Sequence, residues 1–65
     1  MIKIRARIYF KEGFDIDAVE NICDGFDEAD VFYAEPYIRF YGSPERLQEL
    51  VRAIRTVETI KCIKQ

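Results

Sequence analysis

The sequence contains no histidine and no tryptophan, and only one serine and two cysteines in its 65 residues. Without histidine, the side chain that most often serves as a general base and as a metal ligand is missing. A hydroxyl or thiol nucleophile therefore has no evident partner to activate it. A chain this short also buries only about 60% of its unfolded surface, which leaves little stability to offset a strained catalytic pocket. We expect a protein without enzymatic activity, cofactor or bound metal.

Cysteines and long apolar runs are also scarce. Small domains built on disulfides usually carry four or more cysteines, so we predict that Cys23 and Cys62 are reduced core thiols toward opposite ends of a helical layer. No apolar run approaches the ~18 residues of a membrane span, and charges interrupt the start of the chain where a signal peptide would be apolar. We expect one soluble, cytoplasmic domain over residues 1–65.

The two ends of the chain alternate between apolar and polar residues. Over residues 2–10 the isoleucines and Phe10 fall on one side and the basic residues on the other, which predicts a half-buried strand. Residues 58–64 also alternate, with Ile60 and Cys62 on the expected inner side and branched residues frequent. This pattern predicts a last strand.

Apolar residues at helical spacing predict a first helix over residues 16–24. Asp15 can accept hydrogen bonds from the free N–H groups at its start, and Gly25 can adopt the left-handed conformation that ends a helix. Residues 30–35 and 37–41 are rich in aromatic and branched side chains, and the Glu-Pro pair between them predicts a tight hairpin. A second helix is predicted over residues 44–56, with a serine cap before it and proline at its first position.

The predicted order is β-α-β-β-α-β. Right-handed crossovers and a central hairpin then favour an α+β fold of the ferredoxin-like kind, a four-stranded antiparallel sheet with two helices on one face. Many unrelated families share this topology, so it indicates no activity. The loop over residues 11–15 lacks the cysteine pair of copper-chaperone-like domains, and its acids do not suit the anion-binding loop of acylphosphatase-like enzymes. Residues 37–42 do not match the aromatic pattern of RNA-recognition motifs.

Charge is distributed unevenly along the chain. Residues 1–11 hold four bases and no acid, residues 12–35 hold nine acids and no base, and residues 36–65 hold six bases and three acids. The net charge of −2 therefore hides a strongly polarised molecule. The acidic block maps to the first helix, the following loop and an edge strand of the predicted fold. We name its main residues the acidic edge: Asp17, Glu20, Asp24, Asp27, Glu28 and Asp30.

The acidic edge has two interpretations. Acids near a helix N-terminus are stabilised by the helix dipole, so part of the block is typical of an ordinary solvated helix. Nine acids without a compensating base exceed that need and favour docking on a basic partner surface, such as one that otherwise holds nucleic acid. A calcium loop is not indicated, because it needs ligands at alternate positions and glycine at the sixth, whereas Phe26 stands third from Asp24.

The first and third strands would carry basic and aromatic residues on the side away from the helices. Lys61 of the last strand is expected to join them. Interleaved arginine and tyrosine can neutralise phosphates and stack bases, as in single-strand nucleic-acid binding. The same pattern suits an ordinary solvated sheet or a homodimer interface. We name six residues, all expected to be substantially exposed, the sheet face: Arg5, Arg7, Tyr9, Tyr37, Arg39 and Tyr41.

These features predict a small non-enzymatic protein-binding module that masks a larger partner through the acidic edge, the sheet face or both. We expect the partner to be a protein with a basic surface, and no membrane to be involved. Size and charge resemble, in general style, the small inhibitors that viruses and mobile elements encode. The alternative is a module that binds single-stranded nucleic acid on the sheet face. The negative net charge argues against that alternative without excluding it, because local charge sets phosphate contact.

Overall fold

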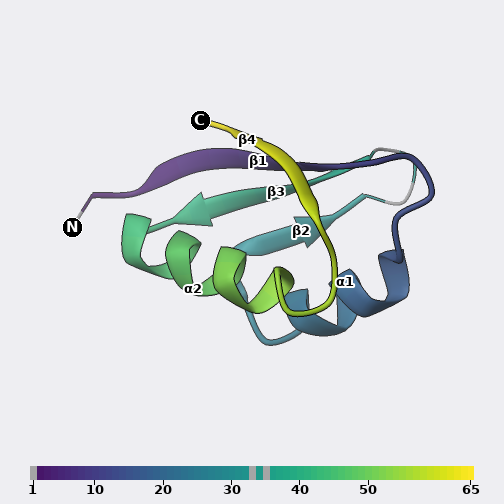
Figure 1. The fold of residues 1–65 in the computed structure, drawn as a ribbon. Coiled ribbons are helices and arrows are strands. Elements are labelled where there is room, and N and C mark those ends of the chain that lie inside the picture. Colours follow the sequence, from purple (N-terminus) through teal and green to yellow (C-terminus); the bar gives the residue numbers. More distant parts are fainter. Residues whose placement is uncertain (1, 33, 35) are drawn as a thin grey trace.

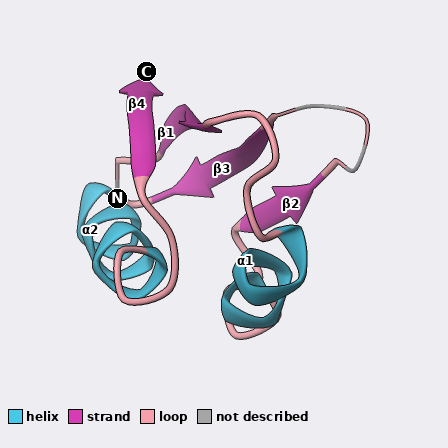
Figure 2. Cartoon of the chain, turned by 45° about the vertical axis from the view of Figure 1, so that its right-hand side comes forward, coloured by secondary structure: helices cyan, strands magenta, loops and turns pink. Residues whose placement is uncertain are grey.

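The computed structural model describes residues 2–32, 34 and 36–65, which form an antiparallel sheet with two helices (Figure 1). Both helices lie on one side of the sheet, and no described element covers the other side (Figure 2). The strand order is β2-β3-β1-β4, with every neighbouring pair antiparallel. The predicted α+β class is confirmed. The elements are β1 (Ile4–Phe10), α1 (Ile16–Cys23), β2 (Ala29–Val31), β3 (Tyr37–Gly42), α2 (Pro44–Ile54) and β4 (Ile60–Lys64).

The core lies between the sheet and the helices. Alternate residues of β1 and β3 face inward, and residues at helical spacing on α1 and α2 meet them. Among the described residues, neither helix is long and apolar enough to cross a membrane. The buried residues are Ala6, Ile8, Phe10, Val19, Cys23, Ile38, Phe40, Leu47, Leu50, Val51 and Ile54.

Side-chain caps fix where both helices begin. The carboxylate of Asp15 accepts a hydrogen bond from the N–H of Ala18 (3.2 Å), and the hydroxyl of Ser43 accepts one from the N–H of Arg46 (3.2 Å). Pro44 occupies the first helical position, where its missing N–H leaves no bond unmade. Both predicted helix starts are confirmed.

The first strand is shorter than predicted. It begins at Ile4, and Ile2 is 76% exposed instead of buried. Ile4 lies opposite Gly42, the last residue of β3, after which Ser43 turns the chain into α2. Ile2 therefore has no strand beside it and no helix above it to bury it.

The central hairpin is wider than predicted. β2 covers Ala29–Val31, not residues 30–35, and its last pair is Val31 with Ile38. Pro36 has no N–H to donate to a ladder, and its carbonyl accepts from the N–H of Phe10 (2.8 Å). β2 therefore ends at Val31 and β3 begins at Tyr37, so the two strands lie further apart in the sequence than the predicted tight turn requires. Two residues of the predicted segment, Tyr33 and Glu35, lie outside the described residues.

Neither helix reaches its predicted end. α1 stops at Cys23, and the N–H of Gly25 donates to the carbonyl of Ile22 (3.2 Å) in an ordinary turn. Gly25 therefore does not adopt the predicted left-handed conformation. Among the described residues, the backbone has a positive φ at Gly13 (79°). α2 stops at Ile54, two residues before its predicted end. The carbonyl of Ile54 accepts hydrogen bonds from the N–H groups of Val57 and Glu58, which form the following turn.

The carboxylate of Glu58 links two parts of the chain before β4 begins. It accepts hydrogen bonds from the N–H groups of Asp15 (2.8 Å) and Thr59 (2.8 Å), which hold its pKa below the usual value. The segment that leads to β4 is thereby tied to the start of α1. β4 itself begins at Ile60, two residues later than predicted.

A β-bulge separates the two halves of β4. Tyr9 lies opposite Cys62, but Phe10 lies opposite Ile60, so Lys61 is an extra residue with no partner position on β1. One extra residue in a strand exchanges the two faces for every residue beyond it.

The bulge overturns two predictions about β4. Cys62 is exposed on the open side of the sheet, not buried in the core, and Ile63 packs against the core. Lys64 lies opposite Arg7 and takes the position on the open side that was expected for Lys61.

The two cysteines should react very differently. Both are free thiols, but burial and the charges of Asp24 and Glu20 raise the pKa of Cys23 to about 11. At about pH 8, we expect Ellman's reagent to label Cys62 in the native protein and Cys23 only after unfolding, because the thiolate is the reactive form. Rapid labelling of two thiols in the native state would contradict the burial of Cys23.

Replacing Leu50 by alanine should remove most of the stability. Leu50 is fully buried, and truncation of a buried leucine costs about 2–5 kcal/mol, close to the whole stability of a domain this small. Gln48→Ala, at an exposed position of the same helix, is the control and should shift a urea-unfolding midpoint little. Equal shifts for the two variants would contradict the placement of the core.

Candidate functional site

A row of charged residues crosses the open side of the sheet. Asp30 of β2 lies opposite Arg39 of β3. Arg39 lies opposite Arg7 of β1, and Arg7 lies opposite Lys64 of β4. Residues paired in this way project to the same side of a sheet. We call these four residues the charged row.

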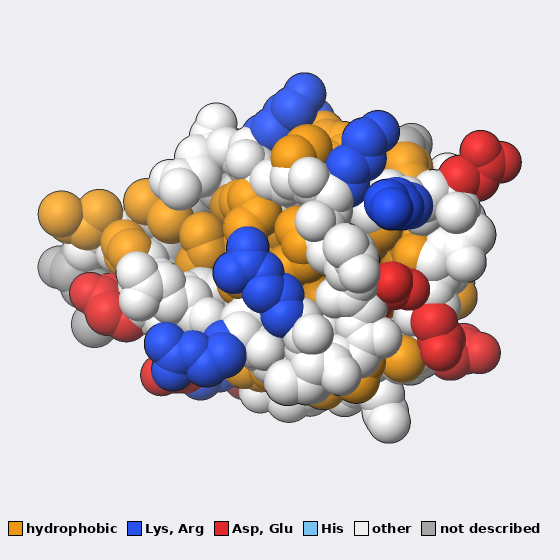
Figure 3. Space-filling view, in the orientation of Figure 1, with side chains coloured by type: hydrophobic (Ala, Val, Ile, Leu, Met, Phe, Trp, Pro, Cys, Tyr) orange, Lys and Arg blue, Asp and Glu red, His pale blue; other side chains and the backbone are white. Residues whose placement is uncertain are grey.

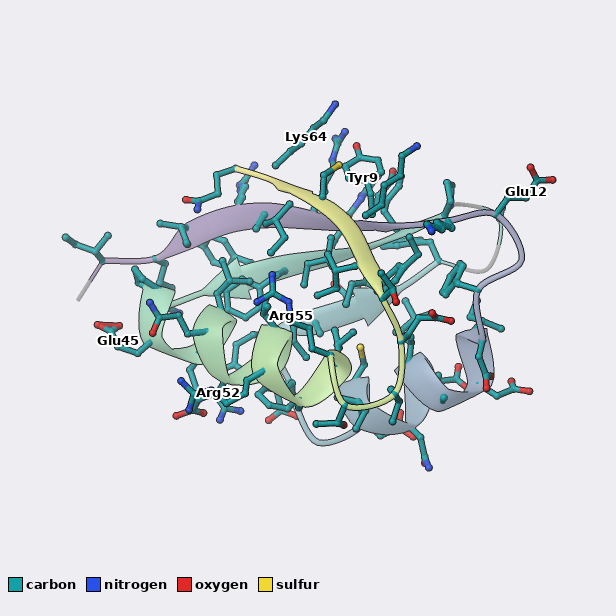
Figure 4. All side chains as sticks on the ribbon, viewed as in Figure 1. Tyr9, Glu12, Glu45, Arg52, Arg55 and Lys64 are labelled. Carbon is teal, nitrogen blue, oxygen red and sulfur yellow. The ribbon has the colours of Figure 1, made fainter. Side chains whose placement is uncertain are left out.

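Aromatic rings lie on both sides of the charged row. On one side Tyr9 and Tyr37 face each other across β1 and β3, with ring centroids 5.1 Å apart. On the other side Tyr41 lies opposite Arg5 and is 53% exposed. Figure 4 shows Tyr9 and Lys64 projecting from the same side of the sheet, away from the helices.

Cations lie close to each of these rings, at distances typical of cation–π contacts. Arg39 lies 4.6 Å from the ring centroid of Phe32, which is 39% exposed beside β2. The other pairs on the open side are Lys64 with Tyr9 (5.3 Å), Arg7 with Tyr37 (5.4 Å), Arg5 with Tyr41 (5.5 Å), Lys3 with Tyr41 (5.6 Å) and Arg39 with Tyr37 (6.0 Å).

The six sheet-face residues are not equally exposed. The three arginines and Tyr41 are exposed, as expected, but Tyr9 and Tyr37 are half-buried. These two rings pack against each other beneath neighbouring cations, which removes part of their surface from water. Tyr41 therefore offers the most open ring of β1 and β3.

The arginines of the charged row oppose each other. Like charges directly opposite in an antiparallel pair destabilise it, and Arg7 faces Arg39 in the middle of the sheet. Arg46 makes both ion pairs found among the described residues. The charged groups of Lys3, Arg5 and Arg39 therefore have no described carboxylate within 4.0 Å.

The charged row lies along an open hollow of about 630 Å³. Among the described lining residues are four cations, two rings of tyrosine and one acidic side chain, Asp30, so the hollow can hold an anionic group next to a planar one. It is lined by Arg5, Ala6, Arg7, Tyr9, Asp30, Arg39, Phe40, Tyr41, Lys64 and Gln65.

The predicted acidic edge is divided among three places. Asp17 and Glu20 lie on α1, and Asp24 and Asp27 follow in the loop, all on the helical side of the sheet. Figure 3 shows acidic side chains near α1, with basic side chains both at the sheet and over α2. Asp30 belongs to the charged row instead.

Glu28 is held by α2. Its carboxylate accepts hydrogen bonds from Nε (3.0 Å) and Nη2 (3.3 Å) of Arg46, which lower its pKa. Arg46 also lies 4.4 Å from the ring centroid of Phe26 and donates to Glu49 (2.6 Å). The charge of Glu28 therefore fastens the loop before β2 to α2.

Three members of the open side were not among the predicted sheet-face residues: Asp30, Phe32 and Lys64. Asp30 could have been found, because Ala29 and Val31 on either side of it are apolar. Lys64 could not, because its orientation depends on the bulge. The described residues contain no group of three or more potential metal ligands. No protein-family model, curated protein or solved structure matches the chain.

The pair of Glu28 and Arg46 should make stability depend on pH. A carboxylate whose pKa is lowered by folding stabilises the folded state above its unfolded pKa, and this contribution is lost as pH falls through the folded pKa. We expect wild-type protein to lose more stability than Glu28→Gln between about pH 6 and about pH 3, measured by urea unfolding. The lowered pKa of Glu58 is common to both proteins and cancels. Identical losses would contradict the ion pair.

Proposed function

We propose that this chain is a non-enzymatic module that binds single-stranded nucleic acid on the open side of its sheet. The observation that carries the proposal is the charged row, in which Arg7 faces Arg39 with Lys64 beyond and aromatic rings lie on both sides. A phosphate between the facing arginines can accept hydrogen bonds from both guanidinium groups. A polymer in which phosphates alternate with planar bases matches both the cations and the rings.

The spacing of the rings suits a short single strand. Tyr37 and Tyr41 are four residues apart on β3, about 13 Å at about 3.3 Å per residue. This distance is roughly that of four stacked nucleotides at about 3.4 Å each. Arg39 lies midway between the two tyrosines. One strand could therefore stack a base at each end while its backbone passes the charged row.

The position of the acids supports the same choice. A protein with net charge −2 would repel phosphates if its acids surrounded the sheet face. Asp17, Asp24 and Asp27 belong to the helical side, and Arg46 offsets the charge of Glu28. Because the Debye length is about 8 Å at physiological salt, acids beyond the sheet have a weakened effect on its open side.

We also propose the ferredoxin-like arrangement for the fold and the cytoplasm for the location. The sheet order β2-β3-β1-β4, with both helices on one side, supports the first proposal. That arrangement makes β1 and β3 the central strands, which carry the charged row.

A protein partner with a basic surface is the second candidate. The observation in its favour is the exposure of Asp17, Asp24 and Asp27, with no described lysine or arginine within ion-pairing distance. A small inhibitor encoded by a virus or mobile element would act in this way. Replacing the three aspartates by asparagine should then abolish binding to the partner and leave oligonucleotide binding intact.

Fluorescence anisotropy with labelled oligothymidylate of about 12 nucleotides tests the first candidate. We expect binding in low salt that weakens steeply as salt rises. Tyr41→Ala should cost about 1–3 kcal/mol, because it removes a stacking ring. Arg39→Gln should reduce the slope of log affinity against log salt by about 0.7, the value for one phosphate contact on a single strand.

Arg52→Gln provides the matched control. It removes the same charge from α2, on the helical side of the molecule (Figure 4). Its affinity should stay near that of the wild type. Absence of binding in low salt, or an equal loss in Arg52→Gln and Arg39→Gln, would contradict the proposed function.

A further inference from the structure

Asp30 is an acid placed on a surface suited to an anion. The side chains of Ala29 and Val31 pack against the core, so the pleat directs Asp30 to the open side. There it lies opposite Arg39 and lines the same hollow as Tyr41. Asp30 is exposed, and its carboxylate makes no ion pair with any lysine or arginine among the residues that the structure describes.

A carboxylate at this place lowers affinity for a nucleic acid unless the ligand donates hydrogen bonds to it. Guanine presents two adjacent donors, N1–H and the N2 amino group, on its Watson–Crick edge. Thymine presents one N–H between two carbonyl acceptors, and adenine and cytosine present one amino group beside an acceptor nitrogen. Guanine is therefore the base that one carboxylate can accept from twice.

The neighbours of Asp30 fit the same base. Tyr41 offers an exposed ring within the same hollow, on which a base can stack. The guanidinium of Arg39, opposite Asp30, has five N–H donors, so one can donate to O6, the acceptor beside N1 of guanine, while others contact the phosphate. Arg39 thus supplies a donor for O6 of guanine, and Asp30 beside it supplies the acceptor for N1–H and the N2 amino group.

We propose that Asp30 is a specificity-determining residue that selects guanine at one position of the bound strand. This proposal rests on the proposed binding of single strands to the open side. It makes two opposite predictions for Asp30→Asn. Loss of the carboxylate should remove the preference for guanine, and loss of the negative charge should strengthen binding to strands that contain no guanine.

The test uses four labelled oligonucleotides of about 12 nucleotides, all thymine except for a central guanine, adenine, cytosine or thymine. One guanine per strand avoids structures that need runs of guanine. We expect wild-type protein to bind the guanine probe about 5- to 150-fold more tightly than the all-thymine probe. Asp30→Asn should bind all four probes with similar affinity, and the all-thymine probe more tightly than wild type does.

Asp27→Asn is the matched control, because it removes an exposed aspartate from the loop before β2. It should keep the preference for guanine. Equal binding of wild-type protein to all four probes, or a guanine preference that survives in Asp30→Asn, would overturn the role of Asp30 and leave the proposed function standing. Failure of every probe to bind, or binding of a protein partner through these residues instead, would overturn both.

Discussion

The pairing of β1 with β3 is the constraint on which the rest of the structure depends. One register places Ile8 opposite Ile38 in the core and Arg7 opposite Arg39 on the open side. A shift of a single residue would exchange the two faces of a strand. Burial of one isoleucine is worth about 1.5–3 kcal/mol, whereas a cross-strand pair contributes about 0.2–1 kcal/mol. The core therefore determines which side chains face each other on the open side of the sheet.

This constraint makes the molecule two-sided. Its helical side is acidic around α1, and its open side gathers the cations of β1, β3 and the end of β4. The Glu28–Arg46 pair keeps one acid on the helical side by fastening the loop before β2 to α2. The sheet thus lies between the acids of α1 and the cations of β1, β3 and β4. That separation is the basis on which we propose an anionic partner for the open side.

The sequence was sufficient to predict the order of the elements and the residues of the open side on β1 and β3, because strict alternation marks which residues are buried. It was not sufficient for β4, since the bulge at Lys61 reverses Cys62 and Lys64 with no signal in the residue pattern. Ile2 continues the alternation of β1 and was therefore predicted to be buried. Its burial depends on where the neighbouring strand stops, which the alternation does not indicate. The division of the acidic edge depends on tertiary contacts, such as the ion pair between Glu28 and Arg46. The spacing of acids along the chain does not predict such contacts.

The central claim is that the open side of the sheet, and not the surface of α1, is the binding surface. Titration of ¹⁵N-labelled protein with a guanine-containing single strand, followed by two-dimensional NMR, tests it most directly. The account predicts shifts of the backbone amide signals of Arg7, Asp30, Arg39 and Tyr41, with little change in α1. Shifts concentrated in α1 and the loop after it, or no shifts in low salt, would contradict it.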